Sequence, residues 1–188
     1  MQTIKTWCTK YTFSFNQKTN IRSFQRGGHI LRSHLEDYIY ELYKSIGVMN
    51  PTDLDIKFIA SKLGVNITYK QKAFRFDDEI ILVKGTESEE WMEFGHEICH
   101  FLRHYGNQLD MHPLFIDLQE YQANYFAYHF CVPTFMLDRL FNYTLSDIMN
   151  LFNVGYEFAS KRLDMYKNKI YSRVLLNGHA RIGVIKHW

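Results

Sequence analysis

Two histidines and a glutamate stand close together in the middle of the chain, in the pattern His96-Glu97-x-x-His100. Residues four apart on an α-helix lie one turn above each other on the same face, so both imidazoles can point at one metal ion. Glu97 lies beside them, where it could act as the base for a water molecule. This spacing is typical of zinc-dependent hydrolases.

The residues around this pattern predict a helix. Thr86 and Glu89 have the spacing of a capping box, acidic residues fill the first turn, and Gly106 is expected to end the helix. At about 100° per residue, the large apolar side chains form one stripe and the histidines fall on the opposite side. We therefore expect the helix to bury one face and to present the histidines on the other.

A second predicted helix, residues 117–131, offers a third ligand. One of its faces is small apart from a carboxylate and an amide, and it consists of Glu120, Ala123, Asn124, Ala127 and Cys131. Small side chains let two helices approach closely, so this face suits packing against the first helix. Glu120 would then complete a site of two nitrogens and one oxygen with a fourth position open. Asn124 is placed to hydrogen-bond a ligand histidine. The alternative is that Glu120 faces solvent.

Other polar residues near the pattern have more open roles. His104 lies eight residues after His96, about 12 Å along a straight helix, so the two cannot share an ion. We expect His104 to line the pocket or to support a ligand. A zinc-dependent hydrolase also needs a hydrogen-bond donor for the oxyanion, for which His104, Tyr121 and Tyr125 are candidates. Cys99 is expected to be a buried, inert thiol.

Taken together, these residues resemble the ImmA/IrrE family of zinc metallopeptidases over about residues 52–165. The residues that carry the resemblance are His96-Glu97-x-x-His100 with His104, Glu120-x-x-Ala123-Asn124-x-Phe126-Ala127, and Pro133. The resemblance implies a gluzincin-like metalloendopeptidase with one zinc ion. It implies His96, His100 and Glu120 as metal ligands and Glu97 as the catalytic base. One departure is Cys99, because the family often has glycine before the second histidine.

The resemblance also implies a substrate. Family members of known role cleave helix-turn-helix repressors and thereby derepress genes of prophages, mobile elements or a DNA-damage response. A helix-turn-helix repressor is therefore the expected partner of this chain, which would act as an anti-repressor.

The fold class expected from the sequence is α+β. Alternating and apolar runs predict a small antiparallel or mixed three-stranded sheet, with strands at 65–69, 72–76 and 79–84. This sheet would pack on the motif helix and the second ligand helix. Two earlier helices are expected at His29–Ile46 and from Thr52 to Leu63.

Four parts follow from these elements. An N-terminal extension and helix (1–51) precede a zincin-like core (52–133). A helical, helix-turn-helix-like subdomain (134–169) follows, with a turn at Asn153-Val154-Gly155. The C-terminal part (170–188) is expected to form a hairpin or tail, because Asn177-Gly178 is a strong two-residue hairpin turn. Within the N-terminal extension, the alternating residues Tyr11–Phe15 predict a strand.

Composition narrows the class of protein. The 188 residues suffice for one domain with a sizeable core. Three widely spaced cysteines, the lack of an apolar signal segment and the lack of an apolar run of about 20 residues predict a cytoplasmic protein with no membrane segment. The sequence makes no prediction of oligomeric state.

An alternative function follows from the charge distribution. Residues 1–33 contain six Lys or Arg residues and no acid, and basic residues also predominate after residue 160. Such ends could contact DNA, and Lys161 and Arg162 lie on the second helix of the helix-turn-helix-like pair. The alternative is thus a non-catalytic, zinc-containing regulator that binds a repressor or DNA. Glu97 argues against it, since a structural zinc site needs no base.

Overall fold

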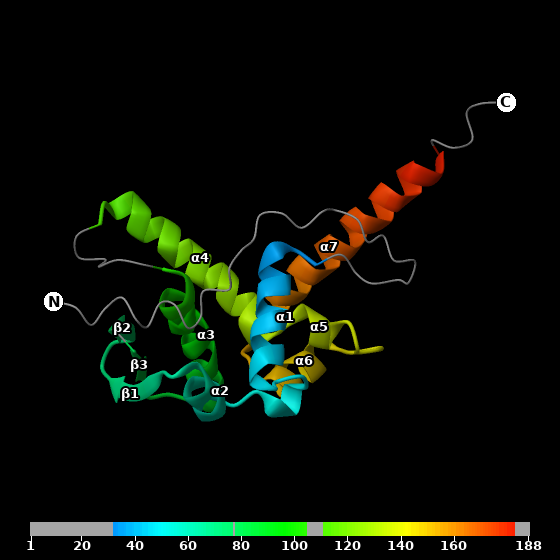
Figure 1. The fold of residues 1–188 in the computed structure, drawn as a ribbon. Helices are drawn as coiled ribbons and strands as arrows, with labels where there is room; N and C mark the ends of the chain where they lie inside the picture. Colours follow the sequence, from blue (N-terminus) through cyan, green and yellow to red (C-terminus); the bar gives the residue numbers. More distant parts are fainter. Residues whose placement is uncertain (1–31, 77, 105–110, 183–188) are drawn as a thin grey trace. The chain divides into compact units, whose positions relative to one another are not determined.

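The structure, a computed structural model, describes residues 32–76, 78–104 and 111–182, and the strand expected at Tyr11–Phe15 lies outside these residues (Figure 1). The α+β class is confirmed. A small sheet is followed by two long helices, α3 and α4, and then by a helical C-terminal part. None of the described helices combines the length and the apolar character that a membrane span requires.

The first two helices begin later than the sequence predicted. Helix α1 (His34–Ile46) starts after Ser33, whose hydroxyl accepts a hydrogen bond from the Glu36 backbone in a capping box. Helix α2 (Ile56–Leu63) is capped by Asp55, which accepts from the Phe58 backbone at 2.6 Å. Pro51–Asp53 form a 3₁₀ turn instead of the expected first turn of this helix. The helix expected from Thr52 therefore begins at Ile56 instead.

The sheet is mixed rather than antiparallel. Its strands are β1 (Asn66–Lys70), β2 (Phe74–Phe76) and β3 (Glu79–Val83), in the order β1-β3-β2. Strand β3 is central, pairing parallel to β1 and antiparallel to β2. Its residues 80–82 are buried, as their continuous apolar run predicted. The wholly antiparallel alternative is wrong, because alternation within a strand does not encode the direction of its neighbour.

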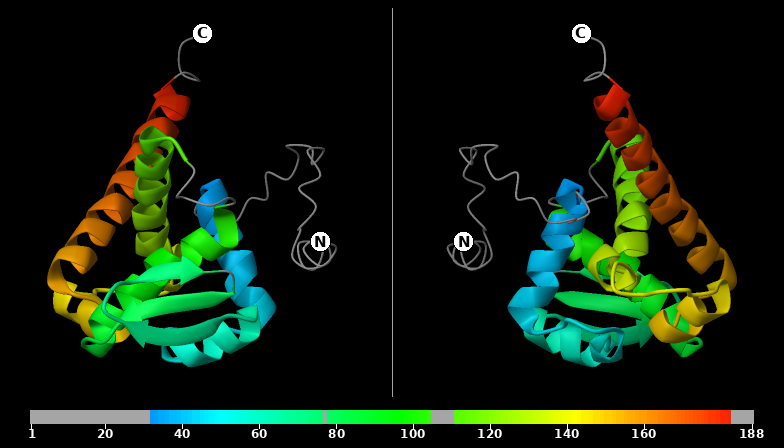
Figure 2. Two further views of the ribbon diagram at one scale, coloured as in Figure 1. Left: turned by 90° about the vertical axis from the view of Figure 1, so that its left-hand side faces the viewer. Right: turned by 90° about the vertical axis from the view of Figure 1, so that its right-hand side faces the viewer.

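Helix α3 (Glu87–Arg103) packs against the sheet and carries the motif (Figure 2). The predicted capping box of Thr86 and Glu89 is confirmed. The helix ends at Arg103, before the predicted stop at Gly106, which lies outside the described residues. Glu90 joins the helix to the sheet, because its carboxylate accepts a hydrogen bond from the Tyr69 hydroxyl at 2.7 Å and pairs with Lys84 at 2.8 Å.

Helix α4 (Pro113–Cys131) begins four residues before the predicted start, with His112 as its cap. It packs along α3 and also contacts α1. The buried aromatic core lies at the C-terminal half of α4. There Phe126 and Phe130 stack on each other, and the Tyr43 hydroxyl of α1 donates to the Phe130 carbonyl oxygen at 2.8 Å.

The C-terminal part contains α5 (Thr134–Leu137), α6 (Leu145–Phe152) and α7 (Tyr156–Ile182). The predicted hairpin across Asn177-Gly178 is wrong, because α7 runs through both residues. Once a helix has formed, each added residue gains a backbone hydrogen bond without a new nucleation cost. A hairpin, in contrast, is stable only where its strands pack against another part of the protein. The domain boundary expected at 169/170 thus falls within a single helix.

The turn between α6 and α7 lies where the helix-turn-helix-like pair was expected, with Asn153 in the left-handed conformation. Arg162 of α7 is, however, fully buried, with 0% of its surface exposed. Its guanidinium donates to the Val132 carbonyl oxygen at 3.0 Å and to the Thr134 hydroxyl at 2.7 Å. Arg162 is therefore not available for DNA contact, whereas Lys161 beside it is exposed.

Candidate metal centre

The close approach of α3 and α4 places the candidate ligands together. Gly95 lies at the helix contact, where a side chain would collide with the Cys131 sulfur and touch Ala127. Ala123, Ala127 and Cys131 are buried against α3, so the predicted small face is confirmed. A larger residue on this face would push α4 and its carboxylate away from the motif helix.

Three ligand atoms converge between the helices, from His96, His100 and Glu120. The His96 Nε2 atom lies 3.1 Å from a Glu120 oxygen and 3.2 Å from the His100 Nε2 atom, and the latter lies 3.5 Å from the other Glu120 oxygen. Zinc bonds of about 2.0–2.1 Å in a tetrahedron separate neighbouring ligand atoms by about 3.3 Å. The two histidine–carboxylate distances involve different Glu120 oxygens, and one ligand atom from each of the three residues lies within 4.8 Å of the other two. Two nitrogens and one carboxylate oxygen form a ligand set that could hold a tetrahedral zinc ion.

A side-chain amide orients the first histidine. The Asn124 Oδ1 atom lies 3.1 Å from the His96 Nδ1 atom. With the amide oxygen as the acceptor, the His96 proton would lie on Nδ1, which would leave the lone pair of Nε2 directed toward Glu120 and His100. The spacing of Asn124 from Glu120 on α4 had predicted this contact.

A longer chain of hydrogen bonds orients the second histidine. The His104 Nδ1 atom lies 2.9 Å from the His100 Nδ1 atom, and its Nε2 atom lies 3.1 Å from the Gln122 Oε1 atom. If the Gln122 oxygen accepts from His104 Nε2, then His104 Nδ1 is bare and accepts from His100 Nδ1. The Nε2 lone pair of His100 then faces the other ligand atoms. Burial lowers the pKa of His104. This favours the neutral ring that the hydrogen bonds to His100 and Gln122 require.

His104 is thus a supporting residue, one of the two roles that its spacing allowed. Gln122 was missed by sequence reasoning, because it lies off the small face of α4 and is exposed at the surface. Only its long side chain brings it to His104. No spacing rule would have singled it out.

The remaining candidates lie in different surroundings. Glu97 is buried in α3, with 7% of its surface exposed, next to His96. Tyr121 is 69% exposed on α4, and the Tyr125 ring packs on His129 with 4.9 Å between ring centroids. Their role in oxyanion binding stays a prediction.

Cys99 is fully buried on α3. Burial raises the pKa of its thiol to about 12, so the side chain stays protonated and unreactive. The expectation of an inert thiol is therefore supported, although the residue lies directly before a candidate ligand.

Comparisons with known proteins agree with this geometry. A peptidase family model described as the IrrE N-terminal-like domain matches residues 52–164. The phage-like element PBSX protein XkdA of Bacillus subtilis (strain 168) is 40% identical over 148 residues, which cover 73% of this chain and 75% of that protein. The uncharacterized protein YqaB of the same organism is 34% identical over 149 residues, covering 73% of this chain and 87% of that protein. The matched region includes α3 and α4 with all the candidate residues.

Proposed function

Because the chain belongs to the ImmA/IrrE family of metallopeptidases, we propose that it is a zinc-dependent endopeptidase. The observation that carries this proposal is the convergence of His96, His100 and Glu120, whose ligand atoms all lie within 4.8 Å of one another. Two nitrogens and one carboxylate oxygen suit a tetrahedral site with one position left for water or substrate.

The chain's own residues would divide the chemistry between them. His96, His100 and Glu120 would hold the zinc ion, which would supply a Lewis acid able to lower the pKa of water toward about 7 and to polarise the scissile carbonyl. Glu97 accepts a proton from the attacking water and delivers it to the nitrogen of the leaving amine. Asn124 and the pair of His104 and Gln122 keep the ligand histidines in the tautomer that leaves each Nε2 atom bare.

The substrate that we propose is a helix-turn-helix transcriptional repressor, whose cleavage would derepress phage, mobile-element or stress genes. The support is the family resemblance and the relative that is named as a protein of a phage-like element. The N-terminal part of α4 also exposes apolar side chains on the helix that carries Glu120, namely Leu114, Phe115, Leu118 and Tyr121. Exposed apolar surface of this kind suits contact with a protein.

The experiment is co-expression of this chain with a small helix-turn-helix repressor encoded beside its gene. We expect a shortened repressor with the wild type and intact repressor with Glu97→Gln. Loss of the base should slow cleavage by about 10²–10⁴-fold while zinc content stays unchanged. Cleavage by Glu97→Gln at the wild-type rate would remove Glu97 from its proposed role.

The alternative of a non-catalytic regulator has less support. A structural zinc site needs no base, and Glu97 is held in the helix beside the ligands. In the helix-turn-helix-like pair, Arg162 is buried and bonded to the chain itself. A salt-dependent DNA complex formed by the purified protein, with no cleavage of any repressor, would favour the alternative.

A further inference from the structure

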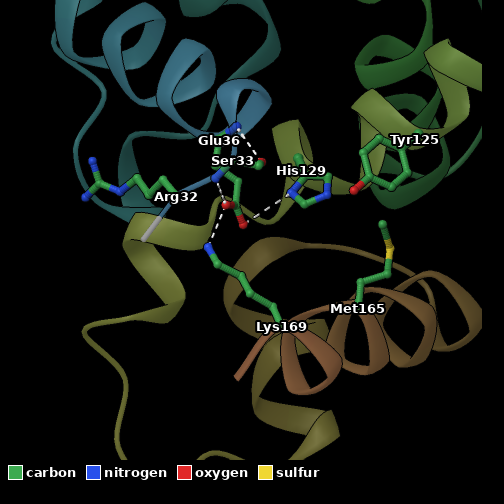
Figure 3. A pocket seen from close by; sticks show the side chains of 7 residues that line it. All are labelled: Arg32, Ser33, Glu36, Tyr125, His129, Met165 and Lys169. Atoms are coloured by element: carbon green, nitrogen blue, oxygen red, sulfur yellow. Dashed lines mark hydrogen bonds and ion pairs between the residues drawn. The ribbon is translucent and has the colours of Figure 1, made fainter. Parts of the chain in front are cut away.

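A second polar site lies between the start of α1, the middle of α4 and α7 (Figure 3). It is a cavity of about 330 Å³, close to the lower end of the range of about 300–1,000 Å³ for small-molecule sites. The residues that line it are Arg32, Ser33, Glu36, Tyr125, His129, Met165 and Lys169. None of them belongs to the candidate metal centre.

Glu36 on one wall of the cavity is fully engaged. Its carboxylate accepts hydrogen bonds from the Ser33 backbone at 2.6 Å, from the Thr134 hydroxyl at 2.6 Å and from the Lys169 ammonium at 2.5 Å. Burial opposes the charged form, but these hydrogen bonds outweigh it and lower the pKa of Glu36. Glu36 therefore stays ionised and offers little free capacity to a ligand.

His129, which also lines the cavity, has the reverse character. It is 95% buried, with 5% of its surface exposed, and neither ring nitrogen has a hydrogen-bond partner among the described residues. The Nδ1 atom lies 3.9 Å from a Glu36 oxygen, too far for a hydrogen bond. Buried polar atoms without partners are rare in folded proteins, since each forfeits its hydration. The imidazole lines the cavity beside Tyr125 (Figure 3).

Cations outnumber carboxylates around the cavity. Lys169 pairs with Glu36 and keeps further N–H groups, because an ammonium has three. Arg162 lies directly behind, linked to Glu36 through the Thr134 hydroxyl. Arg32 also lines the cavity, with its guanidinium 4.1 Å from the centroid of the Tyr40 ring. Lys169 and Arg162 are thus the two cations close to the Glu36 carboxylate. Burial together with the charge of Arg162 lowers the pKa of His129, which keeps the ring neutral.

We propose that this cavity binds a small organic anion, of about the size of an amino acid, through a carboxylate or phosphate group. The anion accepts hydrogen bonds from Lys169, from the N–H of neutral His129 and from the Tyr125 hydroxyl. Its charge balances the excess of cations, and its oxygen satisfies a buried donor that the protein itself leaves without a partner.

The test uses the full-length, zinc-loaded protein labelled with ¹⁵N-histidine, titrated with sodium acetate and, separately, with inorganic phosphate at constant ionic strength. We expect the ring resonances of His129 to shift and to saturate with at least one of the two anions. The anion that saturates at the lower concentration identifies the preferred group. Resonances of His129 that do not respond to either anion would overturn the proposal and leave ordered water as the partner of His129.

Variants separate this site from weaker binding elsewhere. Lys169→Met should weaken the saturable binding by about tenfold or more, since a charged hydrogen bond is lost. Lys161→Met makes the same change of charge on an exposed part of the same helix and should leave binding unchanged. Equal weakening by both variants would show general electrostatic attraction and overturn the proposal.

Two further controls keep the test decisive. If Lys169→Met proves unstable, Tyr125→Phe replaces it in the test. This variant removes one hydroxyl from a half-exposed residue, so it should weaken anion binding without unfolding the protein. Anion binding at the metal centre would shift His96 and His100 and persist in Lys169→Met. If only those resonances respond, the cavity is not an anion site, whereas the proposed peptidase function is unaffected.

Discussion

Helix α4 carries two polar clusters on neighbouring turns, and they differ in how their histidines are satisfied. Around Glu120 and Asn124, the His96 ring has partners at both nitrogens, and so does His104. Around Tyr125, the buried His129 ring has no hydrogen-bond partner within the part of the chain that the structure describes. The first cluster directs three ligand atoms at one point, as a cation requires. The second borders the cavity for which we propose an anion, with Arg32, Lys169 and Glu36 among its lining residues.

The largest effect expected from this comparison concerns Arg162, which supports the second cluster from behind. Arg162→Ala should destabilise the protein by about 3–5 kcal/mol, because it leaves the Val132 carbonyl and the Thr134 hydroxyl without their donor. Chemical denaturation measures this change. Lys161→Ala, at the exposed neighbouring position, should stay within about 0.5 kcal/mol of wild type. A similarly small effect of Arg162→Ala would mean that the cluster does not depend on this guanidinium.

The next effect concerns the first cluster, where Gln122 holds His104 and through it His100. Gln122→Leu should weaken zinc binding by about 10–100-fold, because His100 loses the relay that fixes its tautomer. Gln122→Glu keeps an accepting oxygen and should retain most of the affinity. Competition with a chelator measures both. Equal losses in the two variants would contradict the relay and indicate a purely steric role for Gln122.

The smallest effect concerns the pH dependence that His129 adds. Burial lowers the pKa of His129 in the folded protein. At pH values between this lowered pKa and the ordinary pKa of about 6.5, only the unfolded chain binds the proton. Stability should therefore be lost as the pH falls below about 6.5, by up to about 2 kcal/mol at pH 5. Above pH 6.5 the residue should contribute no pH dependence.

The variant His129→Phe isolates this contribution, because it leaves the metal-site histidines in place. The difference in unfolding free energy between wild type and His129→Phe should change steadily between pH 6.5 and pH 5, with the wild type losing more. A difference that is constant with pH would show that His129 titrates in the folded protein much as it does in the unfolded chain.

Local signals explain what was predictable from the sequence. Thr86 and Glu89 lie within one turn of each other, so the start of α3 could be recognised without knowing the rest of the fold. His96 and His100 need only the pitch of a helix to share a face. Glu120 was recognised because its face is otherwise small, which indicates a close helix contact.

Signals between distant segments explain what was missed. The parallel pairing of β1 with β3 depends on the path of the intervening chain, which alternation does not encode. The turn signal at Asn177-Gly178 was overridden by the continuation of α7. The cavity at His129 draws on α1, α4 and α7, so no single stretch of sequence carries its pattern. In the same way, Gln122 acquires its role only through the orientation of His104.

The most direct test of the central claim is the zinc content of the purified protein, measured by elemental analysis for three variants. The wild type and Asp117→Ala should each contain about one zinc ion per chain, because Asp117 is an exposed carboxylate on the same helix. Glu120→Ala should lose most of its zinc, since its carboxylate supplies one of the three converging ligand atoms. Full zinc occupancy in Glu120→Ala, or a wild type that binds no zinc, would contradict the proposed metal centre.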